Sequence, residues 1–411
     1  MPGLGGAQGG AMALRLSTAP AERTAAEDYL SRVRSIAPVI AGASDRVESG
    51  RRLTPDLVSA LHGAGMYRML LPKAYGGGEV DPATFHLAIS EIAQHDASTA
   101  WCLCQGNGCA MAAAYVAPEI ADKIWGQDPT AVLAWGPPGK ATAVDEGDTF
   151  RVTGAWSFAS GMRHANWLGG HSTVVEKDGT PRKGPNGGPV IRTMLIPASD
   201  AKIVDIWDVI GLRGTASDAF EVTDYAVPRA YTLTRDDPLE LYVDGPLYQF
   251  PQTALYSMGF SGTALGIARA MLEAFKELAG EKTPRRMKSV LRDNGMVQMD
   301  VGLCEARLSA ARAYILNELA DIWGSVLATG KLTVPQRMRI RLMTTYGIHE
   351  AKKTADAVYD LAGATAIFKS SVFERKFRDI HTVTQQVQGR KSNIQSVGSF
   401  LLGNTPDMSV I

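Results

Sequence analysis

The chain has 411 residues, more than one hydrophobic core usually organises, so two or three domains are expected. Its 42 basic and 42 acidic residues give a formal net charge of zero, which argues against nucleic acid or an anionic membrane surface as a partner. The longest apolar stretches, such as residues 109–117, are too short to span a bilayer, and four cysteines suit a reducing cytoplasm better than a disulfide scaffold.

Residues 1–24 are predicted to form a disordered or extended tail, because they are Gly-rich at the start and lack the basic and apolar regions of a signal peptide. An N-terminal helical domain is expected over 25–130. Its apolar residues recur at steps of three and four, as at Phe85, Ala88 and Ile92. Thr54-Pro55 and Asp81-Pro82 each place a capping residue before a proline and mark two helix starts.

A central β domain is predicted over 131–235, where short runs rich in β-branched and aromatic residues are cut by Gly, Pro and Asp. The polar segment 176–189 reads as an exposed hairpin tip. A C-terminal helical bundle is expected over 236–411, with one helix beginning at Val334-Pro335 and ending near Gly363. Two apolar stripes support it: Leu265, Ala268, Leu272, Phe275 and Leu278, then Val301, Cys304, Leu308, Ala311, Ile315 and Leu319.

Cys102 and Cys104 are spaced like half of a metal or redox site. No second cysteine pair and no histidine cluster completes four ligands, so no metal is predicted. Both are expected to be small buried residues on a helix.

The segment 154–167 (GAWSFASGMRHANW) has the composition of a flavin site. An isoalloxazine ring needs a flat apolar wall and a polar group at its N5 edge. Trp156 and Phe158 are suited to the wall and Ser160 to the edge, while Ala159 and Gly161 would bring bare backbone amides close to the ring. Taken alone, the segment equally fits an ordinary strand, turn and strand with Trp156 and Phe158 on one core face.

Residues 25–400 resemble the acyl-CoA dehydrogenase superfamily and, within it, the flavin-dependent monooxygenases that act as oxygenase components of two-component hydroxylases. The likeness rests on the order of five stretches: 52–77, 96–101, 158–167, 211–228 and 375–380. It implies an α+β multidomain fold with an N-terminal helical domain, a central β-barrel and a C-terminal four-helix bundle. It also implies a flavin between the β domain and the bundle, and a homotetramer in which a neighbouring bundle completes the site.

The superfamily contains two reactions. A dehydrogenase needs a carboxylate base, which relatives commonly supply after the Arg-Asp pair of the late helix. Here the stretch after Asp379 offers no carboxylate as far as Gly389. The Arg-x-x-Phe-Gly element that usually holds the FAD pyrophosphate is also missing, and Arg292 begins the equivalent stretch. Acyl-CoA dehydrogenation therefore becomes the second interpretation, and a non-catalytic helical scaffold the third.

The monooxygenase interpretation implies reduced flavin (FADH2 or FMNH2) from a separate reductase, O2, and a C4a-hydroperoxide that oxygenates a small aromatic, amine or sulfur substrate. By the resemblance, Ser160 would contact N5, and Trp101, Trp135 and Phe158 would exclude water. The other cofactor-binding candidates are Ala159, Gly161, Arg213, Arg292 and Gly363. Arg213 would meet a phosphate or else anchor its loop through carboxylates.

Phenol hydroxylases of this branch carry one histidine on the helix after residue 101 and another in the C-terminal segment. Cys109 and Gln386 stand at those places. Without these imidazoles the sequence favours an amine, a thioether or an indole carbon over a phenol as substrate. His164 and His381 are the remaining acid or base candidates with Gln386, although each also suits a structural role, and Trp101, Cys109 and Gln385 are expected in the substrate pocket. The other histidines are interpreted as structural: His62, His86, His95, His171 and His349.

Overall fold

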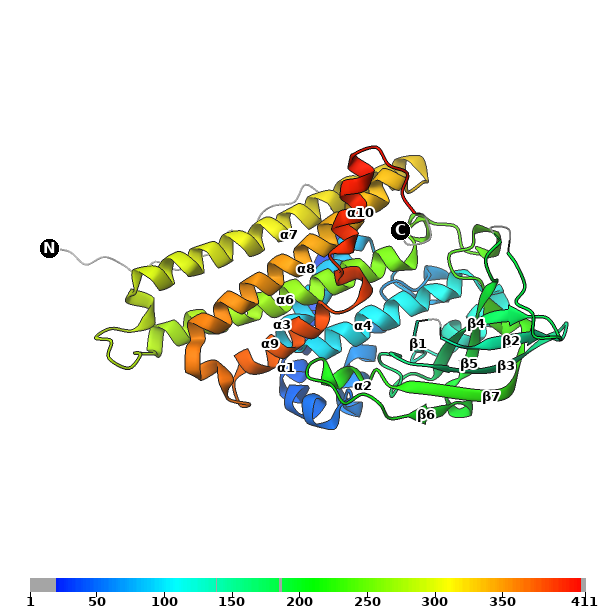
Figure 1. The fold of residues 1–411 in the computed structure, drawn as a ribbon, viewed down its shortest axis with the longest axis horizontal. Helices are drawn as coiled ribbons and strands as arrows, with labels where there is room; N and C mark the ends of the chain where they lie inside the picture. Colours follow the sequence, from blue (N-terminus) through cyan, green and yellow to red (C-terminus); the bar gives the residue numbers. More distant parts are fainter. Residues whose placement is uncertain (1–19, 138, 185–186, 408–411) are drawn as a thin grey trace.

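The computed structural model describes residues 20–137, 139–184 and 187–407, and these run from helices through a sheet to helices again (Figure 1). Residues 1–19 of the predicted tail lie outside the described part. The first helix, α1, begins at Pro20, before the predicted end of that tail.

One long helix and several shorter ones form the N-terminal part. They are α1 (Pro20–Gly50), α2 (Pro55–Gly63), α3 (Pro82–His95), α4 (Ala97–Ala110) and α5 (Pro118–Ala121). Side-chain caps start α3 and α4. The starts predicted at Pro55 and Pro82 are confirmed. Asp81 Oδ1 accepts hydrogen bonds of 2.9 Å from the amides of Ala83 and Thr84, which satisfies donors that a helix end leaves unpaired.

The central part is one curled, eight-stranded half-barrel. Its strands are β1 (Leu133–Trp135), β2 (Thr142–Asp145), β3 (Thr149–Trp156), β4 (Trp167–Val175), β5 (Ile191–Pro197), β6 (Lys202–Val204), β7 (Ala219–Pro228) and β8 (Thr232–Leu233). The strand order is β6-β7-β3-β2-β4-β5-β8, and β1 pairs with β4 in parallel, with Leu133 opposite Trp167. The stretch 211–228, expected to give a pair of strands, gives only β7, which pairs with both β3 and β6.

Long helices form the C-terminal bundle. They are α6 (Gln252–Glu281), α7 (Gly295–Thr329), α8 (Val334–Ala362) and α9 (Val372–Val383), followed by α10 (Ser392–Leu401). Both predicted apolar stripes face the interior, with Leu278 and Val301 only half-buried. A reciprocal capping box between Thr333 and Gln336 starts α8, and Gly363, with φ of 54°, ends it as predicted.

One continuous hydrophobic core joins the N-terminal helices to the bundle, and the sheet has a second, smaller core. Close packing of α6 against α3 and α4 makes this possible. A Cβ built on Gly259 would lie 2.2 Å from Cys104 Sγ, and one on Gly266 would lie 2.2 Å from the carbonyl oxygen of Ser90. The helix α4 thereby lies between the bundle and the sheet, where the aromatic and polar side chains of interest meet (Figure 1).

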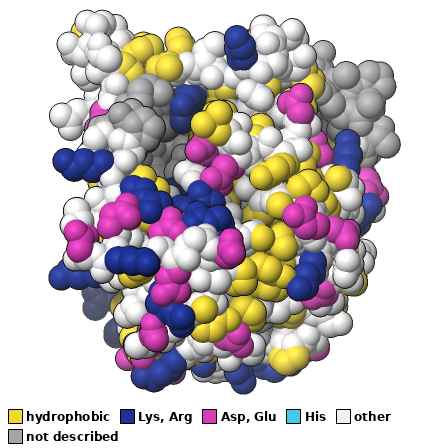
Figure 2. Space-filling model, turned by 90° about the vertical axis from the view of Figure 1, so that its right-hand side faces the viewer, with side chains coloured by type: hydrophobic (Ala, Val, Ile, Leu, Met, Phe, Trp, Pro, Cys, Tyr) yellow, Lys and Arg dark blue, Asp and Glu magenta, His cyan; other side chains and the backbone are white. Residues whose placement is uncertain are grey.

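The surface carries mixed charge. On the end of the molecule that faces the viewer in Figure 2, basic, acidic and apolar side chains are interspersed, in keeping with the zero net charge. No helix in the described ranges is both long and apolar enough to cross a membrane. Within those ranges, no group of three or more His, Cys, Asp or Glu side chains is arranged to hold a metal ion.

Candidate active site

A cavity of about 490 Å³ lies where α4, the sheet, the start of α6 and the C-terminal segment converge. Aromatic and small polar side chains dominate its walls. They are Trp101, Gln105, Trp135, Phe158, Ser160, His171, Trp207, Leu212, Ser217, Arg235, Thr253, Tyr256, Phe260, Thr382, Gln385, Gln386, Val387, Gln388 and Arg390, with Gly136 and Pro137. Trp101, Trp135, Phe158, Ser160, Gln385 and Gln386 are therefore brought together as predicted.

The turn after β3 presents the Ser160 side chain to this cavity. Phe158 has φ of 58° and Gly161 has φ of 82°, so the chain reverses sharply around the serine. The expected bare amides are not bare: the amides of Ala159 and Gly161 donate to the carbonyls of Asp218 and Thr215 at 3.1 and 2.8 Å, and that of Ser160 donates to the Phe158 carbonyl. Only the hydroxyl of Ser160 remains to meet a ligand.

Ala159 and Gly161 do not line the cavity. The Ala159 side chain is buried in the core of the sheet. A Cβ on Gly161 would lie 3.2 Å from the ring of His164, so this glycine makes room for a histidine and not for a cofactor. The turn therefore directs the Ser160 side chain into the cavity and directs its two neighbours away from the cavity.

A directed chain of hydroxyl groups ends at Ser160. Because a carbonyl oxygen only accepts, the Thr215 hydroxyl donates to the Leu212 carbonyl at 2.9 Å. Ser217 then donates to Thr215 at 2.7 Å, and Ser160 donates to Ser217 at 2.6 Å. The indole nitrogen of Trp101 donates to Ser160 Oγ at 3.1 Å. The single hydrogen of the Ser160 hydroxyl is thus committed, and the oxygen can face the cavity only as an acceptor.

Aromatic rings form the walls around this hydroxyl. Trp101 stacks on Phe260 with centroids 4.1 Å apart, and Phe158, 59% exposed, meets the edge of Trp207 at 6.0 Å. Trp156 was predicted as a second wall, but it stacks on Phe220 inside the sheet core and does not line the cavity. The positive φ of Phe158 separates the two residues, and Trp207 takes the place expected of Trp156.

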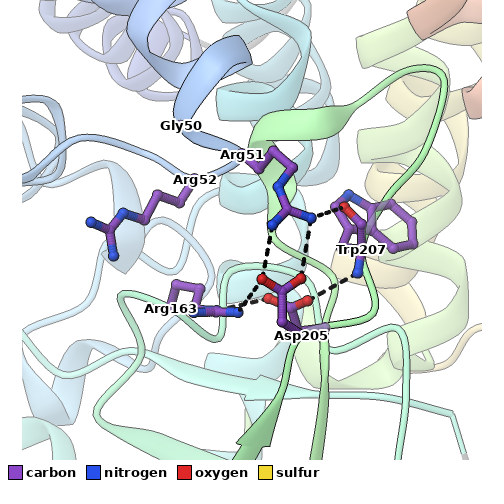
Figure 3. A pocket seen from close by; sticks show the side chains of 7 residues that line it. Gly50, Arg51, Arg52, Arg163, Asp205 and Trp207 are labelled. Atoms are coloured by element: carbon purple, nitrogen blue, oxygen red, sulfur yellow. Dashed lines mark hydrogen bonds and ion pairs between the residues drawn. The ribbon is translucent and has the colours of Figure 1, made fainter.

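A smaller cavity of about 150 Å³ behind this wall contains an ionic brace, shown in Figure 3. Arg51 donates to both carboxylate oxygens of Asp205 at 3.1 and 2.8 Å and to the Trp207 carbonyl at 3.1 Å. The buried Asp218 accepts from Arg163 Nε at 2.7 Å and from the amides of Ile206 and Trp207 at 3.0 and 3.1 Å. The end of α1 and two loops of the sheet are thereby tied together behind Phe158 and Trp207.

His171, interpreted from the sequence as structural, lines the cavity. Its Nδ1 lies 2.7 Å from Thr193 Oγ1, and its buried Nε2 has no partner among the described residues. Burial, aided by the charge of Arg235, lowers the pKa of His171 to about 3, so the imidazole is neutral at ordinary pH. No sequence pattern marks it, because β4 brings it to the cavity only through the fold.

Cys109 lies behind the cavity wall and not in the wall itself. Its buried sulfur is 3.4 Å from the hydroxyl of Tyr256, and Tyr256 is the residue that lines the cavity. Burial raises the pKa of the Cys109 thiol to about 12, which makes it unreactive. Cys102 and Cys104 are buried on α4, as expected of small apolar residues.

The C-terminal segment after α9 covers the cavity with amides. Gln385 and Gln386 line it, and the buried Nε2 of Gln386 lacks a partner within the described chain. His381 does not reach it. Its Nε2 lies 2.9 Å from Asp356 Oδ1 and its ring lies against Phe377, which is a structural contact on the helix surface.

Four other predicted residues lie away from the cavity. His164 is half-buried, with Nε2 2.7 Å from the Tyr67 hydroxyl, and it does not line the cavity. Arg213 Nε lies 3.6 Å from Glu48 Oε1, and Nη1 of the same guanidinium donates to the Val209 carbonyl, so Arg213 anchors its loop as the second alternative expected. Arg292 is exposed beside Asp293, and Gly363 ends α8 near Lys282, both in the bundle.

Among the described residues that line the cavity, none is an aspartate or a glutamate. A base that removes the proton α to a thioester is therefore missing from its walls. The walls instead offer an acceptor hydroxyl, stacked aromatic rings and a neutral imidazole, with Arg235 and Arg390 as the charged groups.

Two family models match the chain. The acyl-CoA dehydrogenase N-terminal domain matches residues 24–123, and the acyl-CoA dehydrogenase C-terminal domain matches residues 258–389. Indole-3-acetate monooxygenase of Pseudomonas putida is 31% identical over 372 residues, covering 89% of this chain and 92% of that protein. The chain belongs to the flavin-dependent monooxygenase branch of the acyl-CoA dehydrogenase superfamily.

Two further comparisons agree with this assignment. The flavin-dependent monooxygenase oxygenase subunit HsaA of Rhodococcus jostii is 27% identical, covering 86% of this monooxygenase and 92% of that subunit. The structure of XiaF from Streptomyces sp. in complex with FADH2 and glycerol superposes with a TM-score of 0.86 at 22% identity, covering 94% and 98% of the two chains. The chain is thus a flavin-dependent oxidoreductase that uses reduced flavin and O2, as the favoured interpretation of the sequence predicted, and the alternative of acyl-CoA dehydrogenation is set aside.

Proposed function

We propose that the cavity holds the isoalloxazine of reduced flavin with its N5 edge at Ser160, and that the enzyme oxygenates an electron-rich aromatic carbon, thioether or amine. The observation that carries this proposal is the direction of the hydroxyl chain. Reduced flavin carries a hydrogen on N5, whereas oxidised flavin has a bare lone pair there. An oxygen that can only accept suits the reduced form.

The walls fit a flat ring system in other respects. The cavity volume of about 490 Å³ is in the usual range for a small-molecule site, and most of its lining is aromatic or apolar. Trp101, Phe158 and Trp207 offer faces and edges for the ring. Reduced flavin would supply the electrons that activate O2, and the protein would exclude water and hold the N5 hydrogen at Ser160.

The substrate class follows from the lack of a strong base. Deprotonating a phenol needs a group that readily takes its proton, and His171, with a pKa lowered to about 3, is a weak one. A neutral imidazole with a free Nε2 instead suits a hydrogen bond to a ring N–H or a polar substituent. The name of the Pseudomonas putida relative supports an indole as the ring.

Turnover with chemically reduced FMN or FAD, measured as product formed from a phenol, a thioether, an amine and an indole, tests the substrate class. We expect the indole or thioether to be oxygenated and the phenol to be a poor substrate. A clear phenol preference would refute this assignment while leaving the flavin site intact.

A separate reductase is expected to deliver the reduced flavin. Two relatives are named as oxygenase components, of a resorcinol hydroxylase and of a p-hydroxyphenylacetate 3-hydroxylase. With NADH and flavin alone, the purified chain should form no product, and added reductase or photoreduced flavin should restore turnover. Turnover with NADH alone would contradict a two-component system.

We also propose a homotetramer in which the bundle of a neighbouring subunit completes the site, as the family resemblance implies. The exposed apolar side chains of Met296, Met299 and Leu303 on α7 support a covered face. Light scattering coupled to size-exclusion chromatography tests the assembly, and a stable monomer would contradict it.

A further inference from the structure

A second cavity, of about 570 Å³, adjoins the first on its outer side. The two share Arg235, Thr253, Val387, Gln388 and Arg390 as lining residues. On the first turns of α6, Tyr256 lines the inner cavity, Ser257 lines the outer one, and Thr253 lines both. Adjacent helix residues point in different directions, so the two cavities lie on either side of the same turn of α6.

One face of α8 forms a wall of the outer cavity. Arg337, Ile340, Arg341, Thr344 and Thr345 all line it, a spacing of three and four residues that defines a single helix face. Two arginines at i and i+4 repel each other. Burial first, and then the charge of Arg337, lowers the pKa of Arg341.

The arginines of this cavity outnumber its acids. Arg235, Arg337, Arg341 and Arg390 line it, with Asp236 as the one carboxylate among the described lining residues. Asp236 Oδ2 lies 3.8 Å from Arg235 Nε. Burial raises the pKa of Asp236, so its carboxylate is less able to neutralise the charge of the arginines. Arg341 donates to the neutral side chain of Asn393 at 3.1 Å, and in the described chain neither Arg341 nor Arg390 forms an ion pair.

We propose that the outer cavity binds an anionic group of the substrate, a carboxylate or phosphate, while the oxidised part of the substrate lies in the inner cavity. This inference rests on the proposed function. The guanidinium of Arg341 is half-buried and has no carboxylate partner among the described residues, which is costly unless an anion joins it, and the exposed Arg390 adds a second positive charge at the rim. The planar fork of a guanidinium matches carboxylate and phosphate oxygens. Because the two cavities share lining residues, a short spacer between ring and anion is enough to reach both. The helix α10 packs against α8 (Figure 1), and Asn393 of α10 accepts from Arg341.

The test compares two ligands that share a ring and differ in charge: indole-3-acetate and 3-methylindole. Dissociation constants are measured by calorimetry on the native enzyme, on Arg341→Gln and on Arg339→Gln. Arg339 is the matched control, because it lies two residues away on α8 and faces Glu318 and Asp321 instead of the cavity. Arg390→Gln provides a second variant at an exposed position, which tolerates substitution if Arg341→Gln fails to fold.

We expect indole-3-acetate to bind the native enzyme more tightly than 3-methylindole. Loss of one charge-assisted contact in Arg341→Gln or Arg390→Gln should weaken indole-3-acetate about 10- to 100-fold. Binding of 3-methylindole should stay unchanged in Arg341→Gln, because Arg341 does not line the inner cavity, and Arg339→Gln should bind both ligands as the native enzyme does. Equal binding of both ligands to the native enzyme, or an unchanged constant for the acid in a folded cavity variant, overturns the proposal.

The anion could also come from the cofactor, so a second arm uses flavins. Reduced riboflavin, which has no phosphate, and reduced FMN are titrated anaerobically into the same variants. If Arg341→Gln weakens FMN and spares riboflavin and indole-3-acetate, the cavity holds the cofactor phosphate and the substrate assignment is wrong. The binding test is independent of the oxygenation reaction. If the enzyme oxygenates neutral indoles and does not bind the indole acid more tightly, this inference is wrong and the proposed function stands. Failure to bind reduced flavin at all would instead remove the proposed function.

Discussion

The hydroxyl chain predicts that replacing Ser217, which accepts the hydrogen of Ser160, changes which redox state of the flavin the site favours. In Ser217→Ala, the acceptor 2.6 Å from Ser160 Oγ is removed. The Ser160 hydrogen is then free to turn toward the cavity and donate to the bare N5 of oxidised flavin. Trp101 still donates to the same oxygen at 3.1 Å, so contact with the reduced form is kept.

The magnitude follows from one neutral hydrogen bond, about 1 kcal/mol net, which corresponds to about a fivefold change in a binding constant. The ratio of the dissociation constants for oxidised and reduced flavin should fall by about that factor. For a two-electron couple, the same free energy lowers the midpoint potential of the bound flavin by about 20 mV.

Anaerobic titrations with oxidised and dithionite-reduced flavin measure the ratio directly. Ser172→Ala is the matched control, because Ser172 is also buried in the sheet and donates to the Gly170 carbonyl, not to the chain at Ser160. If the ratio in a folded Ser217→Ala variant equals that of the native enzyme and of the control, the assigned direction of the hydroxyl chain is refuted.

Three further predictions concern the cavity wall and the fold around it. Trp101→Phe keeps a ring against Phe260 but removes the donor to Ser160, so we expect a several-fold larger share of oxygen released as peroxide, measured as hydrogen peroxide per product; unchanged coupling would contradict a role for that bond. Asp218→Asn removes the buried charge that faces Arg163 and two amides, and we expect urea unfolding to show a loss of about 3 kcal/mol; a loss below about 1 kcal/mol would show that the brace is dispensable. His171 has a pKa of about 3 in the folded chain against an ordinary value of 6.5, so between these pH values only the unfolded chain takes up the proton. The free energy of unfolding should therefore fall as pH drops from 6.5 toward 3, by up to about 1.4 kcal/mol per pH unit. Thermal melts of His171→Gln should show a shallower fall, and an identical slope would count against a neutral buried imidazole.

The predictions of helix boundaries that the structure confirms depend on residues close together in the chain. The helix starts at Pro82 and Val334 depend on a capping side chain and a proline within a few positions, and the start at Pro55 has the proline but no side-chain cap. The end at Gly363 depends on one backbone angle. The stripes on α6 and α7 follow from 3.6-residue periodicity. The ordered family stretches added the fold and the flavin chemistry, which the comparisons confirm.

The direction in which each side chain of a turn points could not be predicted from such local patterns. Ala159, Gly161 and His164 are neighbours of Ser160 in the sequence, yet positive φ angles at 158 and 161 send them to the sheet core and to Tyr67. The prediction that Cys109 lines the cavity is wrong for a related reason, because Tyr256 from another helix lies between Cys109 and the cavity.

The sequence by itself therefore determined the order of helices and strands, the family, and the presence of a serine suited to the flavin edge, since each depends on residues close together in the chain. Only the tertiary structure decided that Ser217 orients that serine, that Trp207 and His171 complete the wall, and that arginines from α8 and from residues 235 and 390 share one chamber. Ser160 and Ser217 are 57 residues apart, Arg235 and Arg390 lie still farther apart in the chain, and no local periodicity or spacing encodes which distant side chains meet.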